Sequence, residues 1–263
     1  MWFSVLGSGS RGNAILVGSG DDLILIDCGF AYKTLVARLD ALGFTPWDVK
    51  AIVLSHLHQD HSQALSPLCK RAGPTIYGTT PTLEGTPALK DKGYLCRGID
   101  FDVPVRIGSM ELLAVPAVHD TEGSACFSVS SGGHKLALLL ETGRITKAMH
   151  GLVNGAQAIV IEANYDPEML ADSVRDGEIP RTVGERIVNG HLRNASAGAF
   201  LANGPHEASL AVLTHLSAQR NTPELALEAV MESLAEAGRD MEVEVSLQGE
   251  PTPLFDLGAY DAH

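Results

Sequence analysis

The 263-residue sequence predicts an α/β fold in which two β-sheets are sandwiched between layers of helices. In each half of the chain, short apolar segments with the length of strands are followed by segments whose apolar residues recur at helical spacing. No Pro-rich or Ser-rich linker and no low-complexity block separates the halves. We therefore expect a single domain over residues 1–263.

The first half alternates strands with turns. The loop G-S-G-S-R-G-N (7–13) and the hairpin turn G-S-G-D-D (18–22) separate the first strands. Leu35, Leu39 and Leu42 recur at helical spacing until Gly43 ends the pattern. Strands are predicted at 1–6, 14–17, 23–26, 51–54 and 75–77, and helices at 32–42 and from Pro81 onward.

The second half repeats this order of strands followed by helices. The segment 222–234 is clearly amphipathic and has Pro223 in its first turn, where proline is tolerated. Strands are predicted at 101–107, 110–115, 125–130, 135–140, 158–161 and 209–213, and helices at 167–171, 194–201 and 222–234.

Composition restricts the class of protein. The first residues lack the pattern of a secretory signal, and the longest apolar runs are too short to span a bilayer. The four scattered cysteines are typical of reduced thiols, so we expect a cytoplasmic protein without a membrane partner. A net charge of −13 argues against a generally basic surface for nucleic acid, although a local basic groove or a metal site can still bind phosphate.

The stretch L-S-H-L-H-Q-D-H (54–61) places three histidines and an aspartate directly after a predicted strand. His56 and His58 are two residues apart and point the same way on an extended stretch, while Asp60 and His61 can reach a second centre. Imidazole and carboxylate ligands without thiolate suit Zn²⁺, Mn²⁺ or Fe. The alternative is a polar surface loop with histidines by chance. The crowding favours a metal site.

The pattern H-L-H-Q-D-H resembles the H-x-H-x-D-H signature of the metallo-β-lactamase superfamily of hydrolases. The resemblance implies a four-layer αββα sandwich with a metal site at one edge. It also implies that His119 completes the first metal site, that Glu141 lies at the bridging position, and that His215 is the last ligand of the second site. Two divalent ions per chain are then expected, with Zn or Mn favoured over Fe.

Glu141 departs from the family pattern, which usually has aspartate at the bridging position. Glutamate is one methylene longer and has one more torsion to fix. It can bridge two ions if the backbone is set back, or it can bind only one ion and leave a weak second site. The sequence leaves both alternatives open.

Several motifs resemble those of the YycJ/WalJ-like branch of this superfamily. They cover nearly the whole chain in the same order: G-S-G-S-R-G-N-A (7–14), I-D-C-G (26–29), I-E-A-N-Y-D-P-E-M-L (161–170), R-I-V-N-G-H-L-R-N (186–194) and H-L-S-A-Q-R-N-T-P-E-L-A (215–226). The resemblance implies a metal-dependent 5′-to-3′ exonuclease that acts on DNA and is linked to DNA repair. Tyr165 and Arg193, like Glu141, depart from the branch pattern, which usually has histidine and serine there.

Two residues near the cluster have structural alternatives. Asp27, at the end of a buried strand, is either the acceptor that fixes a ligand imidazole or a turn residue before Gly29. Asn13, in its glycine-rich loop, either contacts a substrate phosphate or only shapes a tight turn.

The segment G-H-L-R-N (190–194) precedes a predicted helix start, where an anion is favoured. We expect His191 to contact phosphate or to protonate the leaving group, and Arg193 to contact the phosphodiester backbone. Asn194 either binds substrate or acts as the helix N-cap. Asn164 is expected to bind substrate as well, and Asp60 to take part in catalysis besides binding metal.

The sequence thus predicts a metal-dependent hydrolase, most simply a phosphodiesterase or exonuclease that cleaves DNA with a metal-activated hydroxide. A small-molecule ester, thioester or cyclic phosphodiester hydrolase is the alternative, and a weakened metal-binding protein is a third reading. A closed apolar pocket would favour a small substrate. A basic rim would favour nucleic acid, and its expected members are Arg11, Arg144, Arg193 and Arg220.

Overall fold

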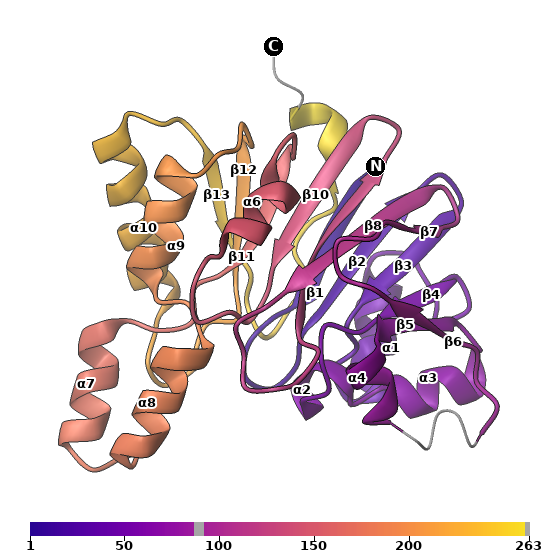
Figure 1. Cartoon of the computed structure of the whole chain (residues 1–263), viewed down its shortest axis with the longest axis horizontal. Helices are drawn as coiled ribbons and strands as arrows, with labels where there is room; N and C mark the ends of the chain where they lie inside the picture. Colours follow the sequence, from indigo (N-terminus) through magenta and orange to yellow (C-terminus); the bar gives the residue numbers. More distant parts are fainter. Residues whose placement is uncertain (87–91, 261–263) are drawn as a thin grey trace.

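The computed structural model describes residues 1–86 and 92–260, which form two mixed β-sheets packed face to face (Figure 1). The first sheet has the order β14 (Phe255–Asp256), β1 (Trp2–Gly7), β2 (Ala14–Ser19), β3 (Asp22–Ile26), β4 (Ala51–Val53), β5 (Thr75–Thr79), β6 (Cys96–Ile99). The second sheet has the order β13 (Glu242–Val245), β12 (Leu210–Thr214), β11 (Ala158–Glu162), β10 (His134–Leu139), β9 (Ala125–Ser131), β8 (Met110–Pro116), β7 (Val105–Ile107).

Helices cover the outer face of each sheet (Figure 1). Those that follow strands of the first sheet are α1 (Tyr32–Ala41), α2 (Gln59–Ser62), α3 (Leu65–Arg71) and α4 (Thr80–Glu84). Those in the second half are α6 (Lys147–Val153), α7 (Pro167–Arg175), α8 (Arg181–Gly190), α9 (Asn194–Asn203), α10 (Pro223–Ala237) and the 3₁₀ helix η1 (Leu257–Tyr260). The pair α7–α8 projects away from the sandwich (Figure 1). No helix of the described part of the chain is long and apolar enough to cross a membrane.

Three buried apolar layers hold the sandwich together. One lies between the sheets and includes Phe3 and Phe127, which are fully buried. A second joins the second sheet to α6, α9 and α10, and a third joins the first sheet to α1 and α3. Burying each large apolar side chain contributes about 1.5–3 kcal/mol. The predicted αββα fold class is therefore confirmed.

Strand direction brings the polar loops together. Strands β3 to β6 of the first sheet are parallel, and so are β10 to β13 of the second. The carboxyl ends of parallel strands meet at one edge of a sheet, where ligands of α/β proteins bind. The residues that the sequence predicted for the site lie in the loops after β1, β3, β4, β8, β10, β11 and β12 and in the segment that joins α8 to α9.

Most predicted elements are confirmed, with a few differences. The strand predicted at 101–107 is shorter, because only Val105–Ile107 pairs with β8, and an unpredicted strand, Cys96–Ile99, forms the sheet edge. The helix predicted at 194–201 starts at Asn194, and Arg193 occupies the N-cap position. The N-cap alternative for Asn194 is therefore wrong.

Candidate metal centre

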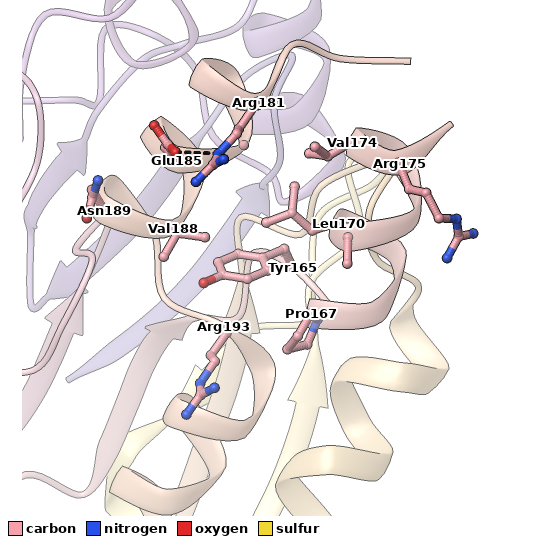
Figure 2. Close-up of a pocket in the computed structure, with 12 residues that line it drawn as sticks. Tyr165, Pro167, Leu170, Val174, Arg175, Arg181, Glu185, Val188, Asn189 and Arg193 are labelled. Carbon is pink, nitrogen blue, oxygen red and sulfur yellow. Dashed lines mark hydrogen bonds and ion pairs between the residues drawn. The ribbon is translucent and has the colours of Figure 1, made fainter. Parts of the chain in front are cut away.

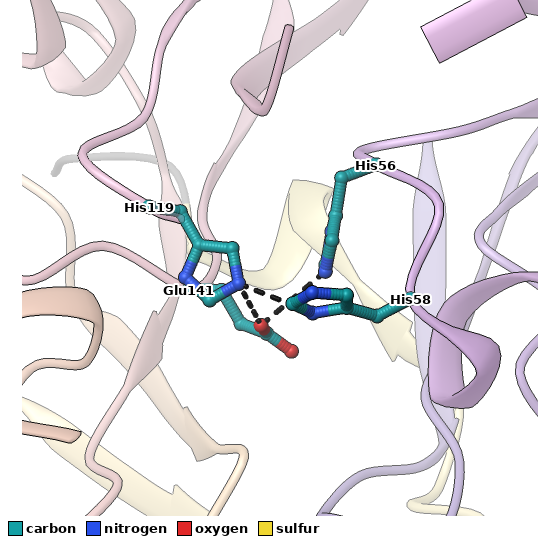
Figure 3. Close-up of side chains that lie close together, drawn as sticks. All are labelled: His56, His58, His119 and Glu141. Carbon is teal, nitrogen blue, oxygen red and sulfur yellow. Dashed lines mark hydrogen bonds and ion pairs between the residues drawn. The ribbon is translucent and has the colours of Figure 1, made fainter. Parts of the chain in front are cut away.

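The first group of metal-capable side chains consists of His56, His58, His119 and Glu141. Their nitrogen and oxygen atoms all lie within 4.8 Å of one another, and the side chains converge from the loops after β4, β8 and β10 (Figure 3). His58 and His119, which are 61 positions apart in the chain, therefore meet at one point. This is the arrangement that a first metal site requires.

The second group consists of Asp60, His61, Glu141 and His215, again within 4.8 Å. Glu141 belongs to both groups, and its two oxygens face different partners. Oε2 lies 3.1 Å from His119 Nε2, whereas Oε1 lies 3.0 Å from His215 Nε2 and closer still to His61. A carboxylate that presents one oxygen to each group has the geometry of a bridging ligand, despite the extra methylene of glutamate.

Strained backbone conformations occur at this edge. Asp27, Glu141 and His215 have φ values of 60°, 39° and 55°, in a region that residues other than glycine rarely adopt. Within residues 1–86 and 92–260, Asp102 is the one other non-glycine residue with positive φ. Such strain costs about 1–3 kcal/mol per residue and is found at functional sites. It turns each side chain from its strand end toward the shared centre.

Asp27 sets the orientation of His61. The Asp27 carboxylate is 1% exposed, lies 2.7 Å from His61 Nδ1, and accepts hydrogen bonds from the backbone N–H and the hydroxyl of Ser55. The Nδ1–H of His61 donates to this carboxylate, which leaves Nε2 directed at Glu141.

Glu162 has the same relation to His215, and sequence reasoning missed it. Its Oε1 lies 2.8 Å from His215 Nδ1 and 2.7 Å from His191 Nδ1. Its Oε2 accepts from the backbone N–H groups of Thr142 and Leu192. This fully buried carboxylate therefore orients one residue of the second group and one residue of the cleft. Its position in the motif I-E-A-N, at the end of β11, was the available signal.

Two further contacts orient the first group. His119 Nδ1 lies 2.9 Å from the carbonyl oxygen of Gly190 and donates to it, so that Nε2 faces Glu141. His58 Nε2 lies 2.9 Å from the hydroxyl of Thr121, and its Nδ1 faces His119 at 3.3 Å. In each of these two rings, one nitrogen contacts a neighbouring residue and the other faces the group of metal-capable side chains.

Two glycines allow the loops to approach one another. A Cβ on Gly29 would lie 1.6 Å from the carbonyl oxygen of Asp60, and one on Gly143 would lie 1.9 Å from that of Asn189. Neither position can hold a side chain without displacing backbone. The motifs I-D-C-G and L-E-T-G therefore require glycine for packing of the site loops.

The electrostatics of the centre favour a bound cation. Burial would lower the pKa of His61, but the carboxylates of Glu141 and Asp27 outweigh it and raise this pKa to about 10. Burial also opposes protonation of His215, yet Glu141 and other carboxylates raise its pKa well above the usual value. The negative charge is thus strong enough to keep buried imidazoles protonated unless a metal ion takes the place of the proton.

The residues present fit a divalent metal ion. His56 Nε2 and His215 Nε2 are buried and, among the described residues, have no hydrogen-bond partner, although both face Glu141. A buried polar atom without a partner is costly and calls for an explanation. A metal ion would satisfy both nitrogens, and the set of imidazoles and carboxylates suits Zn²⁺, Mn²⁺ or Fe.

A cleft of about 250 Å³ opens beside the two groups. Its walls include His191, Arg186 and Arg220, together with His58, Asp60 and Glu141. Of the predicted basic rim, Arg220 lines this cleft and Arg193 lines a neighbouring groove. Arg11 and Arg144 are exposed and belong to neither lining, whereas the unpredicted Arg186 does line the cleft and pairs with Asp120.

The three asparagines singled out in the sequence are buried. Asn13 accepts hydrogen bonds from Ser8 Oγ and Gly9 N, and its amide nitrogen lies 3.3 Å from Asp60 Oδ2. Asn164 donates to the carbonyl oxygen of His215. Asn194 forms a reciprocal amide pair with Asn221. All three side chains are thus hydrogen-bonded within the protein, and Asn164 also lines the cleft.

The fold and this centre together define a class of protein. Residues 7–167 match the family model of the metallo-β-lactamase superfamily, and the chain belongs to that superfamily. The chain is 31% identical over 244 residues to "Exodeoxyribonuclease YycJ" of Bacillus anthracis, covering 90% of both chains. It is 27% identical over 269 residues to "Exodeoxyribonuclease WalJ" of Streptococcus pneumoniae, covering 97% of both. The crystal structure of the metallo-β-lactamase fold protein YhfI of Bacillus subtilis superposes with a TM-score of 0.72 at 19% identity, covering 95% of this chain and 98% of that one.

Proposed function

We propose that this chain is a metal-dependent phosphodiesterase that degrades DNA as an exonuclease. The observation that carries the proposal is the Glu141 carboxylate, which presents one oxygen to each of two groups of metal-capable side chains. The two relatives named exodeoxyribonucleases match nearly the whole chain, and this supports DNA as the substrate. We extend the proposal to a single hydrolase domain over residues 1–263, acting in the 5′-to-3′ direction in cytoplasmic DNA repair.

The ligands that we propose for the first ion are His56, His58, His119 and Glu141, and those for the second are Asp60, His61, Glu141 and His215. Two divalent ions, Zn or Mn before Fe, would supply an activated water near neutral pH and would polarise the phosphodiester. Glu141 holds the two groups together through its carboxylate. We propose that Asp60, whose side chain is 25% exposed and lines the cleft, also takes part in catalysis by accepting a hydrogen bond from the attacking water.

His191 is the proposed proton donor to the leaving oxygen. Its ring lines the cleft, its side chain is 20% exposed, and its Nδ1 is held by Glu162. Burial would lower the pKa of His191, but the charge of Glu162 outweighs it and raises this pKa. A histidine kept protonated near neutral pH can act as a general acid.

For the remaining predicted residues we propose either positioning of the site loops or contact with the substrate. We propose that Asn13, Asn164 and Asn194 position the site loops, because their amides are engaged within the protein. Arg193 is exposed, with its Nε bonded to Ser196, and is free to contact a phosphate.

A small phosphodiester or ester is the second candidate substrate. The modest volume of the cleft, about 250 Å³, and the net charge of −13 favour it. The arginines beside the cleft favour nucleic acid instead, since phosphate contacts dominate the affinity of proteins for DNA. The shared position of Glu141 argues against a weakened metal-binding protein.

The test is a degradation assay on 5′-phosphorylated duplex and single-stranded DNA with added Mn²⁺ or Zn²⁺. We expect release of nucleotides from the 5′ end by the wild-type protein and none by His58→Ala. Hydrolysis of bis(p-nitrophenyl) phosphate without any degradation of DNA would overturn the DNA proposal and establish the small-substrate alternative. Undiminished DNA degradation by His58→Ala would overturn the proposed centre.

A further inference from the structure

A second cavity lies outside the metal cleft, in a groove between α7 and α8 (Figure 2). It has a volume of about 660 Å³. Tyr165, Leu170 and Val174 line it on the apolar side, and Val188 on α8 is 49% exposed there. This volume falls within the range of about 300–1,000 Å³ that holds a ligand, and it is too small for a duplex.

Helix α8 is the wall between the groove and the metal cleft. Val183 and Ile187 line the cleft, whereas Gly184 and Val188, each one position further along the helix, line the groove. Beyond the helix, His191 lines the cleft and Arg193 lines the groove. The two depressions therefore flank a single helix, so one extended molecule can occupy both.

The lining of the groove has more cationic than anionic side chains. Three arginines, Arg175, Arg181 and Arg193, line it together with one carboxylate, Glu185. In the whole chain, 32 Asp and Glu residues outnumber 19 Lys and Arg residues. Arg181 pairs with Glu185 at 2.9 Å, and Arg175 pairs with two aspartates outside the lining. Arg193 has no ion pair among the described residues, so its guanidinium favours an anionic group at this end of the groove.

An aromatic ring lies beside one of these cations. Tyr165 and Arg193 are joined by an isolated parallel β-bridge, and both side chains line the groove (Figure 2). Tyr165 is only 5% exposed, so the wall offers mainly the apolar surface of Val188, which a flat base can cover while the guanidinium of Arg193 contacts a phosphate. Free phosphate would not use the apolar wall, and a purely apolar ligand would leave the arginines unused.

We infer that the α7–α8 groove binds the single-stranded nucleotides that continue the substrate strand beyond the phosphodiester held in the metal cleft. The inference rests on the proposed function and extends it: the cleft takes the scissile bond, and the groove takes the following part of the strand. Binding in the groove then raises the affinity for oligonucleotides over small diesters.

Two groove variants with opposite charge effects test this. Val188→Asp adds a negative charge to the groove without touching the cleft, and Glu185→Gln removes the negative charge already there. Val103→Asp is the matched control, because Val103 is 50% exposed and precedes β7 at the far edge of the second sheet. Thermal melting verifies that each variant is folded.

Binding of a fluorescent 5′-phosphorylated single-stranded oligonucleotide is measured in a His58→Ala background, so that degradation does not interfere. We expect Val188→Asp to raise the Kd about fivefold, the factor for one unit charge about 4 Å from a phosphate in water. Glu185→Gln is expected to lower the Kd, and Val103→Asp to leave it unchanged. In the otherwise wild-type protein, Val188→Asp should raise KM for the oligonucleotide and leave KM for bis(p-nitrophenyl) phosphate unchanged.

The outcomes separate the inference from the proposed function. Degradation of DNA by the wild-type protein, combined with unchanged oligonucleotide affinity in both groove variants, overturns the groove inference alone and points to another occupant, such as a protein partner. Absence of any oligonucleotide binding or degradation by the wild-type protein overturns both. If Val188→Asp does not fold, the isosteric Glu185→Gln variant still tests the inference. A lower Kd for the oligonucleotide supports it, and an unchanged Kd overturns it.

Discussion

Replacing Glu141 with glutamine removes one negative charge from the point where the two groups of side chains meet. The Glu141 oxygens lie 3.0 Å from His215 Nε2 and 3.1 Å from His119 Nε2. A cation bound by these nitrogens is therefore within about 4 Å of the carboxylate, given metal–nitrogen distances of about 2 Å. The shape of the side chain is retained, so the change isolates the effect of charge.

The size of the effect follows from this distance. One unit charge about 4 Å from a divalent ion contributes about 8 kcal/mol at an effective dielectric constant of about 20. Since about 1.4 kcal/mol corresponds to a factor of ten, the affinity for metal should fall at least about 1,000-fold. Both sites should weaken, because Glu141 faces both groups.

Metal content by mass spectrometry and titration against a chelator measure the two affinities. Glu111→Gln is the control, since Glu111 is exposed on β8. Glu141→Asp provides a second comparison: its carboxylate is drawn back by about one C–C bond of ~1.5 Å and should lose one ion before the other. Two ions bound by Glu141→Gln with wild-type affinity would refute the shared-carboxylate argument.

Three other outcomes are expected. Glu162→Gln should lower metal affinity or activity about 10- to 100-fold, because His215 and His191 lose the carboxylate that orients them; unchanged metal affinity and kcat would contradict this. Chelation of the metal should lower the melting temperature by about 5–10 °C when the metal is present at about 100 times its Kd, and calorimetry with and without chelator measures the shift. Burial and the charge of Arg239 lower the pKa of His206 to about 4 in the folded protein, below the value of about 6.5 in the unfolded chain. As the pH falls, His206 is therefore protonated in the unfolded state before it is protonated in the folded state. The stability of the fold should fall between about pH 6.5 and about pH 4. Urea unfolding at several pH values should show that the free energy of unfolding falls less for His206→Gln than for the wild-type protein over this range. Equal losses of stability would contradict the role of His206.

The fold class and the centre of the site could be predicted from sequence because their signals are local. The strand Ala51–Val53 and the cluster His56–His61 are adjacent in the chain, and the pattern of apolar strands does not depend on distant residues. The sequence could not decide whether Glu141 faces one group of ligands or both. The direction of its oxygens depends on a positive φ and on histidines that lie far away in the chain.

Other features could not be predicted because they depend on tertiary contacts. Helix α8 contains Gly184 and Gly190, which lower its helix propensity, and its few apolar residues face the groove and the cleft and not the core, so it was not recognised as a helix. Glu162 reads as the polar end of a buried strand until His191 and His215, 29 and 53 residues further on, are placed beside it. Arg193 is the N-cap of α9 because its backbone is extended, and Asn194, whose amide pairs with that of Asn221, is the first helical residue.

The central claim is that two groups of side chains share Glu141 to hold two metal ions. The most direct test is an anomalous difference map from crystals grown with Mn²⁺ or Zn²⁺. We predict two peaks about 3.5–4 Å apart, one beside His56, His58 and His119 and the other beside His61 and His215, with a Glu141 oxygen on each. A single peak, or two peaks with Glu141 bound to only one of them, would contradict the account.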